Sequence, residues 1–119
     1  MSPASVAIIG SRSFLDEAAV RAVVRALPAG ITVISGGAPG PDAWAVDEAR
    51  AMGLRTEVVR PDLAGAAGRG AITGRYYARN RAMVDRCQRV IAFLAGERGG
   101  AVYTAAYAEA KGVPVEVHR

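Results

Sequence analysis

The sequence predicts an α/β protein in which a mostly parallel five-stranded sheet lies between two layers of helices. Short β-branched runs alternate with longer alanine-rich segments, which is the pattern of a parallel sheet with crossover helices. The expected strands are almost continuously apolar, as strands buried on both faces are. Right-handed crossovers leave few topologies, and we favour the strand order 3-2-1-4-5. The 119 residues form a single domain, 1–119.

The first expected strand and helix follow directly from apolar spacing. Val6–Ile9 is an apolar run that Gly10 ends, which is typical of a buried strand. Asp16–Leu27 has apolar residues at positions 19, 20, 23, 24 and 27, which form one helical stripe. Pro28 and Gly30 end this helix.

The next two strands flank a second helix. Ile31–Ser35 is a β-branched run that Gly36–Gly37 breaks. Pro41–Met52 has a proline in its first turn, and Gly53 stops it, which is the usual asymmetry of helix ends. Thr56–Val59 is the third strand, and the proline at position 61 ends it.

Residues 62–74 carry four glycines and no periodic pattern, so we expect a mobile or ligand-dependent loop there. Pro114 opens the last expected strand, Pro114–His118, and a proline in a strand favours an edge of the sheet because it has no N–H to donate. The elements expected after the loop are a helix over Tyr76–Arg86, a strand over Arg89–Leu94, a loop over Gly96–Gly100, a helix over Ala101–Lys111 and a strand over Pro114–His118.

Composition excludes several classes of protein. Hydrophobic residues make up 51% and charged residues 22%, close to the average of soluble domains. No apolar run approaches the length of a membrane span, and no signal peptide is evident, so we expect a cytoplasmic protein without a membrane partner. One cysteine, Cys87, and one histidine, His118, are too few for a disulfide or a zinc site. We expect no metal and no cofactor.

Three glycine-containing loops should meet at the carboxyl edge of the sheet, where parallel sheets bind ligands. They are residues 10–12, 36–42 and 96–100, and each leads into a helix. Glycine permits close backbone approach, and a helix N-terminus favours phosphate, although tight turns also use glycine for its conformation alone. A GxxxxGK[ST] phosphate loop is absent, and the one lysine, Lys111, lies late in a helix.

Polar side chains near these loops complete the candidate site. Arg75 and Arg79 share a helix face and form either an anion clamp or a solvated basic face. Asp42 complements a helix dipole or holds a ribose hydroxyl. The ligand-binding candidates are Gly10, Ser11, Arg12, Gly36, Gly37, Gly40, Asp42, Arg75, Arg79, Asn80, Gly96, Arg98, Gly99 and Gly100, and the catalytic candidates are Arg79, Asp42 and Glu97.

The remaining aromatic and sulfur side chains fit packing roles better than ligand roles. Tyr76 and Tyr77 fall on or beside the helical stripe that should face the sheet. Tyr103 and Tyr107 can stack on a base, but we favour core or dimer packing. Trp44 is interpreted as a core or partner contact, and Cys87 as an inert core thiol.

Several segments occur in an order that resembles a known family. They are GSRSF after the first strand, SGGAPGPDAWA over 35–45, RNRAM over 79–83, and AFLAG over 92–96 with Gly99–Gly100. Together they resemble small standalone domains of the SLOG superfamily, of the YspA/YpsA type. This Rossmann-like superfamily includes the DNA-processing protein DprA and the LOG enzymes. The resemblance implies a nucleotide-derived ligand at the strand-end edge, and pairing of copies into a homodimer or higher homo-oligomer.

The resemblance leaves three functions open. Binding of a nucleotide or a nucleotide-derived phosphorylated ligand is the leading hypothesis. LOG-like hydrolysis of a nucleoside monophosphate is the second, but the glutamate of the LOG motif is replaced by Thr104, and a carboxylate is needed beside an oxocarbenium ion. DprA-like nucleic-acid binding is the third, and we rank it lower because the sequence shows no clear aromatic and basic strip.

Overall fold

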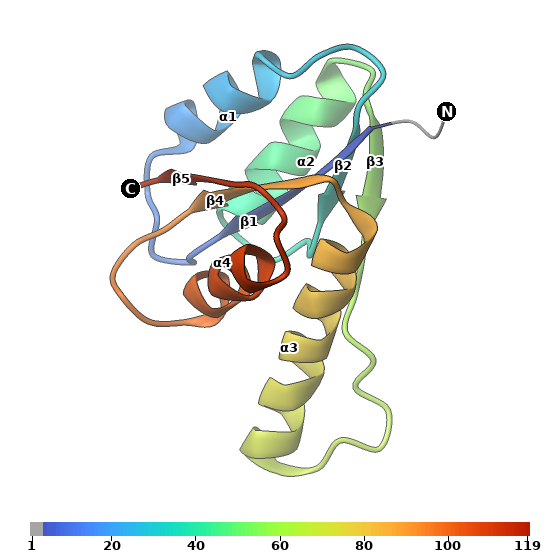
Figure 1. Ribbon diagram of the computed structural model, residues 1–119, viewed down its shortest axis with the longest axis vertical. Helices are drawn as coiled ribbons and strands as arrows, with labels where there is room; N and C mark the ends of the chain where they lie inside the picture. Colours follow the sequence, from blue (N-terminus) through green and yellow to red (C-terminus); the bar gives the residue numbers. More distant parts are fainter. Residues whose placement is uncertain (1–3) are drawn as a thin grey trace.

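The computed structural model describes residues 4–119 and has the predicted three-layer α/β architecture (Figure 1). All strand pairs are parallel, and the strand order is β3-β2-β1-β4-β5, which confirms the predicted order. The strands are β1 (Ser5–Gly10), β2 (Thr32–Ser35), β3 (Arg55–Val58), β4 (Arg89–Phe93) and β5 (Val115–His118). The helices are α1 (Glu17–Arg25), α2 (Pro41–Ala51), α3 (Gly68–Arg86) and α4 (Gly100–Ala110).

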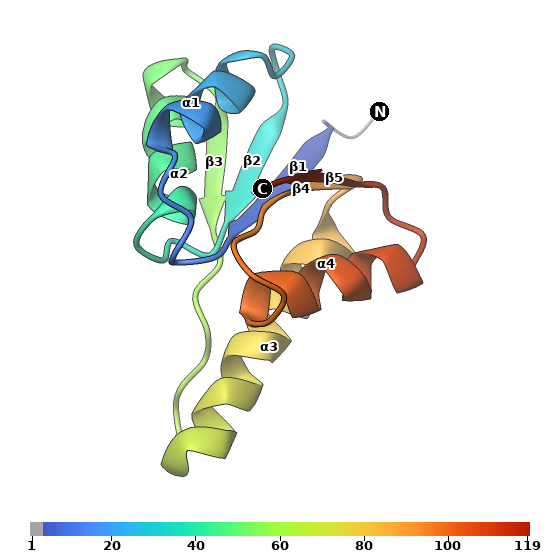
Figure 2. The ribbon, with the colours of Figure 1, turned by 90° about the vertical axis from the view of Figure 1, so that its left-hand side faces the viewer.

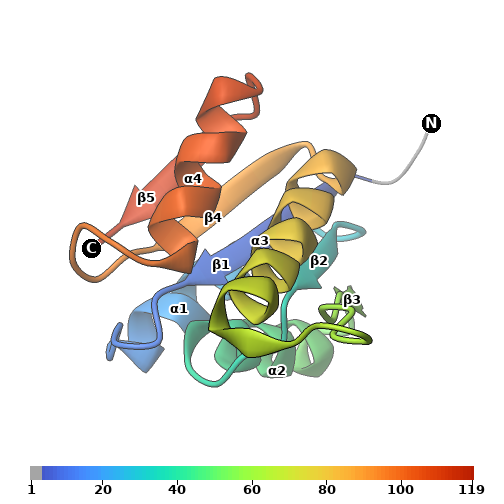
Figure 3. The same ribbon diagram turned by 90° about the horizontal axis from the view of Figure 1, so that it is seen from below.

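Two apolar clusters hold the layers together, one on each face of the sheet. Alternate residues of the central strand serve different clusters, so that Val6 and Ile8 contact the α1/α2 layer while Ala7 and Ile9 contact the α3/α4 layer. Figure 3 shows the two helix pairs on opposite sides of the sheet. Burial of β1 on both faces explains why its sequence is continuously apolar. The last strand, β5, lies at an edge of the sheet, as predicted, and Pro114 directly precedes it.

The segment expected to be a loop over 62–74 is partly helical, which corrects that prediction. Helix α3 begins at Gly68, well before the expected start at Tyr76. Gly70 and Gly74 lie inside it, and residues 68–74 are all exposed. Glycine weakens a helix and no apolar stripe runs through these residues, so their pattern carries no helical signal. The first turns of α3 extend beyond the sheet from the edge to which β1, β2 and β3 point (Figure 2).

The carboxyl edge of the sheet depends on one close backbone approach. A Cβ added to Gly10 would lie 2.4 Å from Cβ of Pro41, so the end of β1 and the start of α2 touch where no side chain fits. No helix within residues 4–119 has both the length and the apolar content that crossing a bilayer demands.

We predict that Gly10→Ala lowers the free energy of unfolding by about 1–3 kcal/mol, because the new methyl group forces β1 and α2 apart. The matched control is Gly74→Ala, since a Cβ there meets no atom within 4 Å. Alanine is favoured over glycine inside a helix by roughly 0.5–1 kcal/mol, so the control should unfold at the same or a higher denaturant concentration. Urea denaturation followed by circular dichroism measures both, and an equal loss of stability in the two variants would contradict the packing argument.

Candidate functional site

A pocket of about 420 Å³ opens at the carboxyl edge of the sheet. It is formed by the end of β1 and the loop after it, the loop after β4, the starts of α2 and α4, and the middle of α3. Its lining residues are Ile9, Gly10, Ser11, Arg12, Ser13, Ala38, Asp42, Tyr76, Tyr77, Arg79, Asn80, Met83, Arg98, Gly99, Gly100 and Ala101. This volume lies in the range of about 300–1,000 Å³ that small-molecule pockets occupy.

Ser11 fixes the floor of the pocket between the two central strands. Its N–H donates to the carbonyl of Phe93 at 2.9 Å. Its Oγ accepts a hydrogen bond from the N–H of Ala95 at 3.0 Å. Because the hydroxyl acts as acceptor in that bond, its proton stays available to an acceptor in the pocket.

Asp42 is the one carboxylate among the lining residues, and it is 8% exposed. Its Oδ2 accepts a hydrogen bond from the N–H of Ala38 at 3.3 Å. Burial raises the pKa of Asp42 to about 6, although the Ala38 N–H and the nearby charges of Arg79 and Arg12 act in the opposite direction. The carboxyl group therefore titrates near pH 6 and is mostly ionised at pH 7.

Arg79 joins three elements at the back of the pocket. Its Nη1 donates to the carbonyl of Gly36 at 3.0 Å and to the carbonyl of Val59 at 3.1 Å. Its Nε donates to Oδ1 of Asn80 at 2.7 Å, and its guanidinium lies 5.4 Å from the ring centroid of Tyr76. Burial lowers the pKa of Arg79, against the opposing effect of Asp42. This arginine has a structural role, because it connects the ends of β2 and β3 to α3.

Arg12 and Arg98 differ from Arg79, since both are exposed and neither has a hydrogen-bond or ion-pair partner among residues 4–119. Arg98 directly precedes Gly99, the N-cap of α4, which has φ +115° and no side-chain cap, while the backbone of Arg12 lies against Gly40 at the start of α2. By contrast, Asp16 caps α1 through a hydrogen bond from the N–H of Ala19. The free N–H groups of α4 and the two guanidinium groups together form a site suited to an anion.

The structure brings most of the predicted ligand residues into this pocket but separates some of them. The predicted residues that line it are Gly10, Ser11, Arg12, Asp42, Arg79, Asn80, Arg98, Gly99 and Gly100. Gly36 lies just behind it, against the Arg79 guanidinium, and Gly40 lies next to Arg12. Gly37 lies on the other side of the loop beside Arg60, and the Gly96 carbonyl accepts a hydrogen bond from Arg119.

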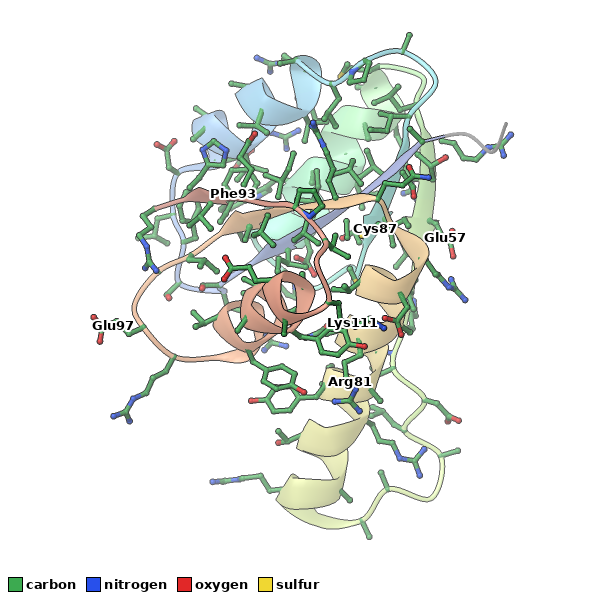
Figure 4. The ribbon with its side chains drawn as sticks, viewed as in Figure 1. Glu57, Arg81, Cys87, Phe93, Glu97 and Lys111 are labelled. Atoms are coloured by element: carbon green, nitrogen blue, oxygen red, sulfur yellow. The ribbon has the colours of Figure 1, made fainter. Side chains whose placement is uncertain are left out.

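Two charged candidates lie away from the pocket. Arg75 donates to the carbonyl of Asp62 at 3.0 Å, so it does not form a clamp with Arg79. We expected Arg75 at the start of its helix, but α3 begins at Gly68 and places it further along. Glu97 is exposed and points outward from the loop after β4 (Figure 4).

The pocket also contains aromatic side chains that the sequence pattern assigned to the sheet. Tyr76 and Tyr77 line it because α3 overhangs the sheet edge at that turn, so a stripe expected to pack on strands faces the cavity instead. The ring of Tyr77 stacks on that of Tyr103 from α4, with centroids 4.4 Å apart and planes at 20°. Two adjacent tyrosines close to Arg79 were the sequence feature that pointed to an aromatic wall. Apolar periodicity could not show that the sheet ends before it reaches Tyr76 and Tyr77.

The side chains outside the pocket offer little chemistry. Thr104 is fully buried and donates to the Gly100 carbonyl at 2.7 Å, so it does not replace the missing glutamate. Burial raises the pKa of the Cys87 thiol, which disfavours the reactive thiolate. His118 contacts Glu116 at 2.6 Å in the edge strand. Among residues 4–119, no three metal-ligating side chains gather at one point.

No protein-family model and no curated protein matches the chain. Two solved structures do. The structure of DNA processing protein A (DprA) from Streptococcus pneumoniae shares 23% sequence identity, with a TM-score of 0.78 over 96% of this chain. DprA from Helicobacter pylori, in a structure that concerns its mode of binding single-stranded DNA, shares 24% identity with a TM-score of 0.81 over 99% of this chain.

This chain spans 50% of the S. pneumoniae structure and 67% of the H. pylori structure. The likeness to both confirms the Rossmann-like fold and its five-stranded parallel sheet. It relates this chain to the DprA structures in fold.

The raised pKa of Asp42 predicts a pH-dependent stability. The unfolded chain releases this proton near pH 3.8 and the folded chain near pH 6, so the folded state binds more protons between these values. The free energy of unfolding should therefore fall as pH rises from 4 to 6, by about 2 kcal/mol from this group. In Asp42→Asn, this contribution to the pH dependence of the free energy of unfolding should disappear.

Urea denaturation between pH 4 and pH 7 measures the effect. Asp47→Asn is the control, because Asp47 lies on the same helix with 65% of its side chain exposed. A difference between Asp42→Asn and the wild type that stays constant across this pH range would contradict the assignment.

Proposed function

We propose that this chain binds single-stranded DNA, and that the pocket at the carboxyl edge of the sheet holds one of its phosphates. The observation that carries the proposal is that Arg12, Arg98 and the uncapped start of α4 line one pocket. Guanidinium forks and helix N–H groups are the donors that phosphate oxygens prefer. A hydroxyl on Ser11 supplies a further donor at the same place.

Basic groups continue beyond the pocket, which favours a chain of phosphates over a single one. Gly37, with φ +72°, lines a smaller hollow of about 170 Å³, in which Arg50 and Arg60 outnumber the one carboxylate, Asp47. Arg60 is exposed, and its Nη1 lies 3.8 Å from where a Cβ of Gly37 would be. Arginines thus lie on both sides of the 36–42 loop. A strand that crosses this loop meets a guanidinium on each side, and each can bind a phosphate.

The likeness in fold to the H. pylori DprA structure supports the same ligand class, since that structure concerns single-stranded DNA binding. Single strands also suit a pocket of this shape better than a duplex does, because a single phosphate with its sugar can enter a concave site. For this reason we place nucleic-acid binding ahead of the binding of a free nucleotide.

A free nucleotide remains the second candidate, because the pocket volume of about 420 Å³ accommodates a small phosphorylated ligand. Hydrolysis of such a ligand would have to use Asp42, the one carboxylate that lines the pocket. Asp42 is only 8% exposed and its Oδ2 already accepts the N–H of Ala38, so the carboxylate offers little open surface to an oxocarbenium ion. We therefore propose binding without cleavage.

We predict that replacing both Arg12 and Arg98 by alanine weakens single-stranded DNA binding by roughly tenfold for each arginine. The magnitude of the slope of log affinity against log salt should fall by about 1.4, because each phosphate that an arginine neutralises contributes about 0.7. Fluorescence anisotropy with a labelled oligonucleotide over a salt series measures both. Arg79 is not used because its removal also breaks two tertiary hydrogen bonds.

The control for charge is Arg55→Ala with Arg89→Ala. These exposed arginines begin β3 and β4, at the opposite edge of the sheet. The control protein carries the same net charge as the test protein and should keep the wild-type affinity to within about twofold. Equal decreases in affinity in the two double variants would show non-specific attraction and would overturn the proposed site.

A mononucleotide separates the two candidate ligands. A free nucleotide that occupied the pocket at 100 times its Kd would stabilise the fold by about 2.7 kcal/mol. We expect AMP, IMP, GMP and CMP at millimolar concentration to raise the melting temperature less than an oligonucleotide at equal phosphate, and to release no free base by chromatography. Saturable stabilisation by one mononucleotide with no binding of the strand would favour the second candidate instead.

A further inference from the structure

Beside the phosphate pocket, two helices bring aromatic rings into contact. Tyr77 comes from α3 and Tyr103 from α4, and their ring planes are nearly parallel at 20° with centroids 4.4 Å apart. Tyr77 also lines the pocket itself, and its Cε1 lies 3.8 Å from where a Cβ of Gly100 would be. The stacked pair therefore continues the wall of the pocket outward along the start of α4.

Part of this pair is open to solvent. Tyr103 exposes 37% of its surface, although a ring of this size usually finds burial. Arg81 donates to the Tyr103 hydroxyl at 3.0 Å, so that hydroxyl is held in place and the pair has a positive charge at its rim. Figure 4 shows Arg81 between α3 and α4. The rings are thus positioned by two helices and a hydrogen bond while ring surface remains uncovered.

An ordered aromatic surface beside a phosphate site has the composition of a nucleobase site. Flat rings bind bases through stacking, which accepts every base because each has a π face. A cation at the rim adds attraction for the π face and for a neighbouring phosphate. Tyr107, four residues along α4, lacks this setting, because its hydroxyl donates to Asp85 and it lies over the α3/α4 apolar cluster.

We propose that the Tyr77–Tyr103 pair is a stacking platform for one nucleobase of the strand whose phosphate occupies the pocket. The proposal rests on the proposed function, since it extends the same site. It assigns affinity without base selectivity to this pair, because stacking accepts every base.

The test compares a normal single-stranded oligonucleotide with an abasic oligonucleotide of equal phosphate number. Tyr103→Ala should weaken binding of the normal strand by about five- to a hundredfold and leave the abasic strand unchanged, since only the normal strand has a base to stack. Tyr103→Phe is the matched control, because it keeps the ring and removes only the hydroxyl that meets Arg81. It should bind both strands within about twofold of the wild type.

A fluorescent base gives a second readout. The emission of 2-aminopurine placed along the strand should be quenched at one position by the wild type and by Tyr103→Phe, and not by Tyr103→Ala. If Tyr77 alone keeps some stacking, the double variant Tyr77→Ala with Tyr103→Ala removes it. Circular dichroism shows whether each variant keeps the helical content of the wild type.

The outcomes separate this proposal from the function on which it rests. If the wild type binds neither strand, the proposed function is wrong. If the wild type binds both but Tyr103→Ala and the double variant weaken both equally or neither, strand binding stands and the platform is wrong. If the substitution changes the mass of the protein in solution and leaves strand affinity intact, the pair is an interface between copies of the chain, and the platform is again overturned.

Discussion

The two hydrogen bonds that Arg79 donates to the carbonyls of Gly36 and Val59 hold the candidate site together. They join the ends of β2 and β3 to a helix whose first turns extend beyond the sheet (Figure 2). The buried residues of α3, Met83 and Val84, lie near its other end. Helices without a packed face are marginal in water. The guanidinium therefore anchors α3 at the point where it becomes one wall of the pocket.

The same arginine sets the electrostatics of the pocket together with Asp42. Burial disfavours the charged form of both Asp42 and Arg79. The opposite charge of each group partly offsets the shift in the pKa of the other. Because Asp42 keeps a raised pKa of about 6 despite this pairing, it becomes protonated as pH falls through 6 and is mostly ionised at pH 7. An anion bound at the start of α4 would favour the protonated form further, since protonation removes a like charge from the pocket.

Some of these features can be predicted from sequence and some cannot, for physical reasons. The strand order follows from apolar runs such as Val6–Ile9, because strands buried on both faces leave a clear pattern. The glycine loops could be placed at one edge because parallel strands share their direction. The first turns of α3 could not be predicted, since Gly70 and Gly74 oppose a helix and no apolar spacing marks it. The partners of Arg79 lie 43 and 20 residues away, and only the folded chain brings their carbonyls to one guanidinium.

Net charge alone does not identify the site, because arginine is spread over the whole chain. Several arginines are paired, as Arg25 is with Glu48 at 3.0 Å, and an exposed arginine gains little from one anion in water. What distinguishes Arg12 and Arg98 from the equally exposed Arg89 is their setting: they share a concave pocket with uncapped helix N–H groups. Several donors that converge on one partly desolvated anion bind it more strongly than scattered charges do, because the field there is less screened. In the proposed platform, the stacked rings beside that point would add an interaction that depends less on salt than the phosphate contacts do. The arrangement of Arg12 and Arg98 in a pocket, and not the number of arginines in the chain, therefore distinguishes this edge of the sheet as the candidate anion site.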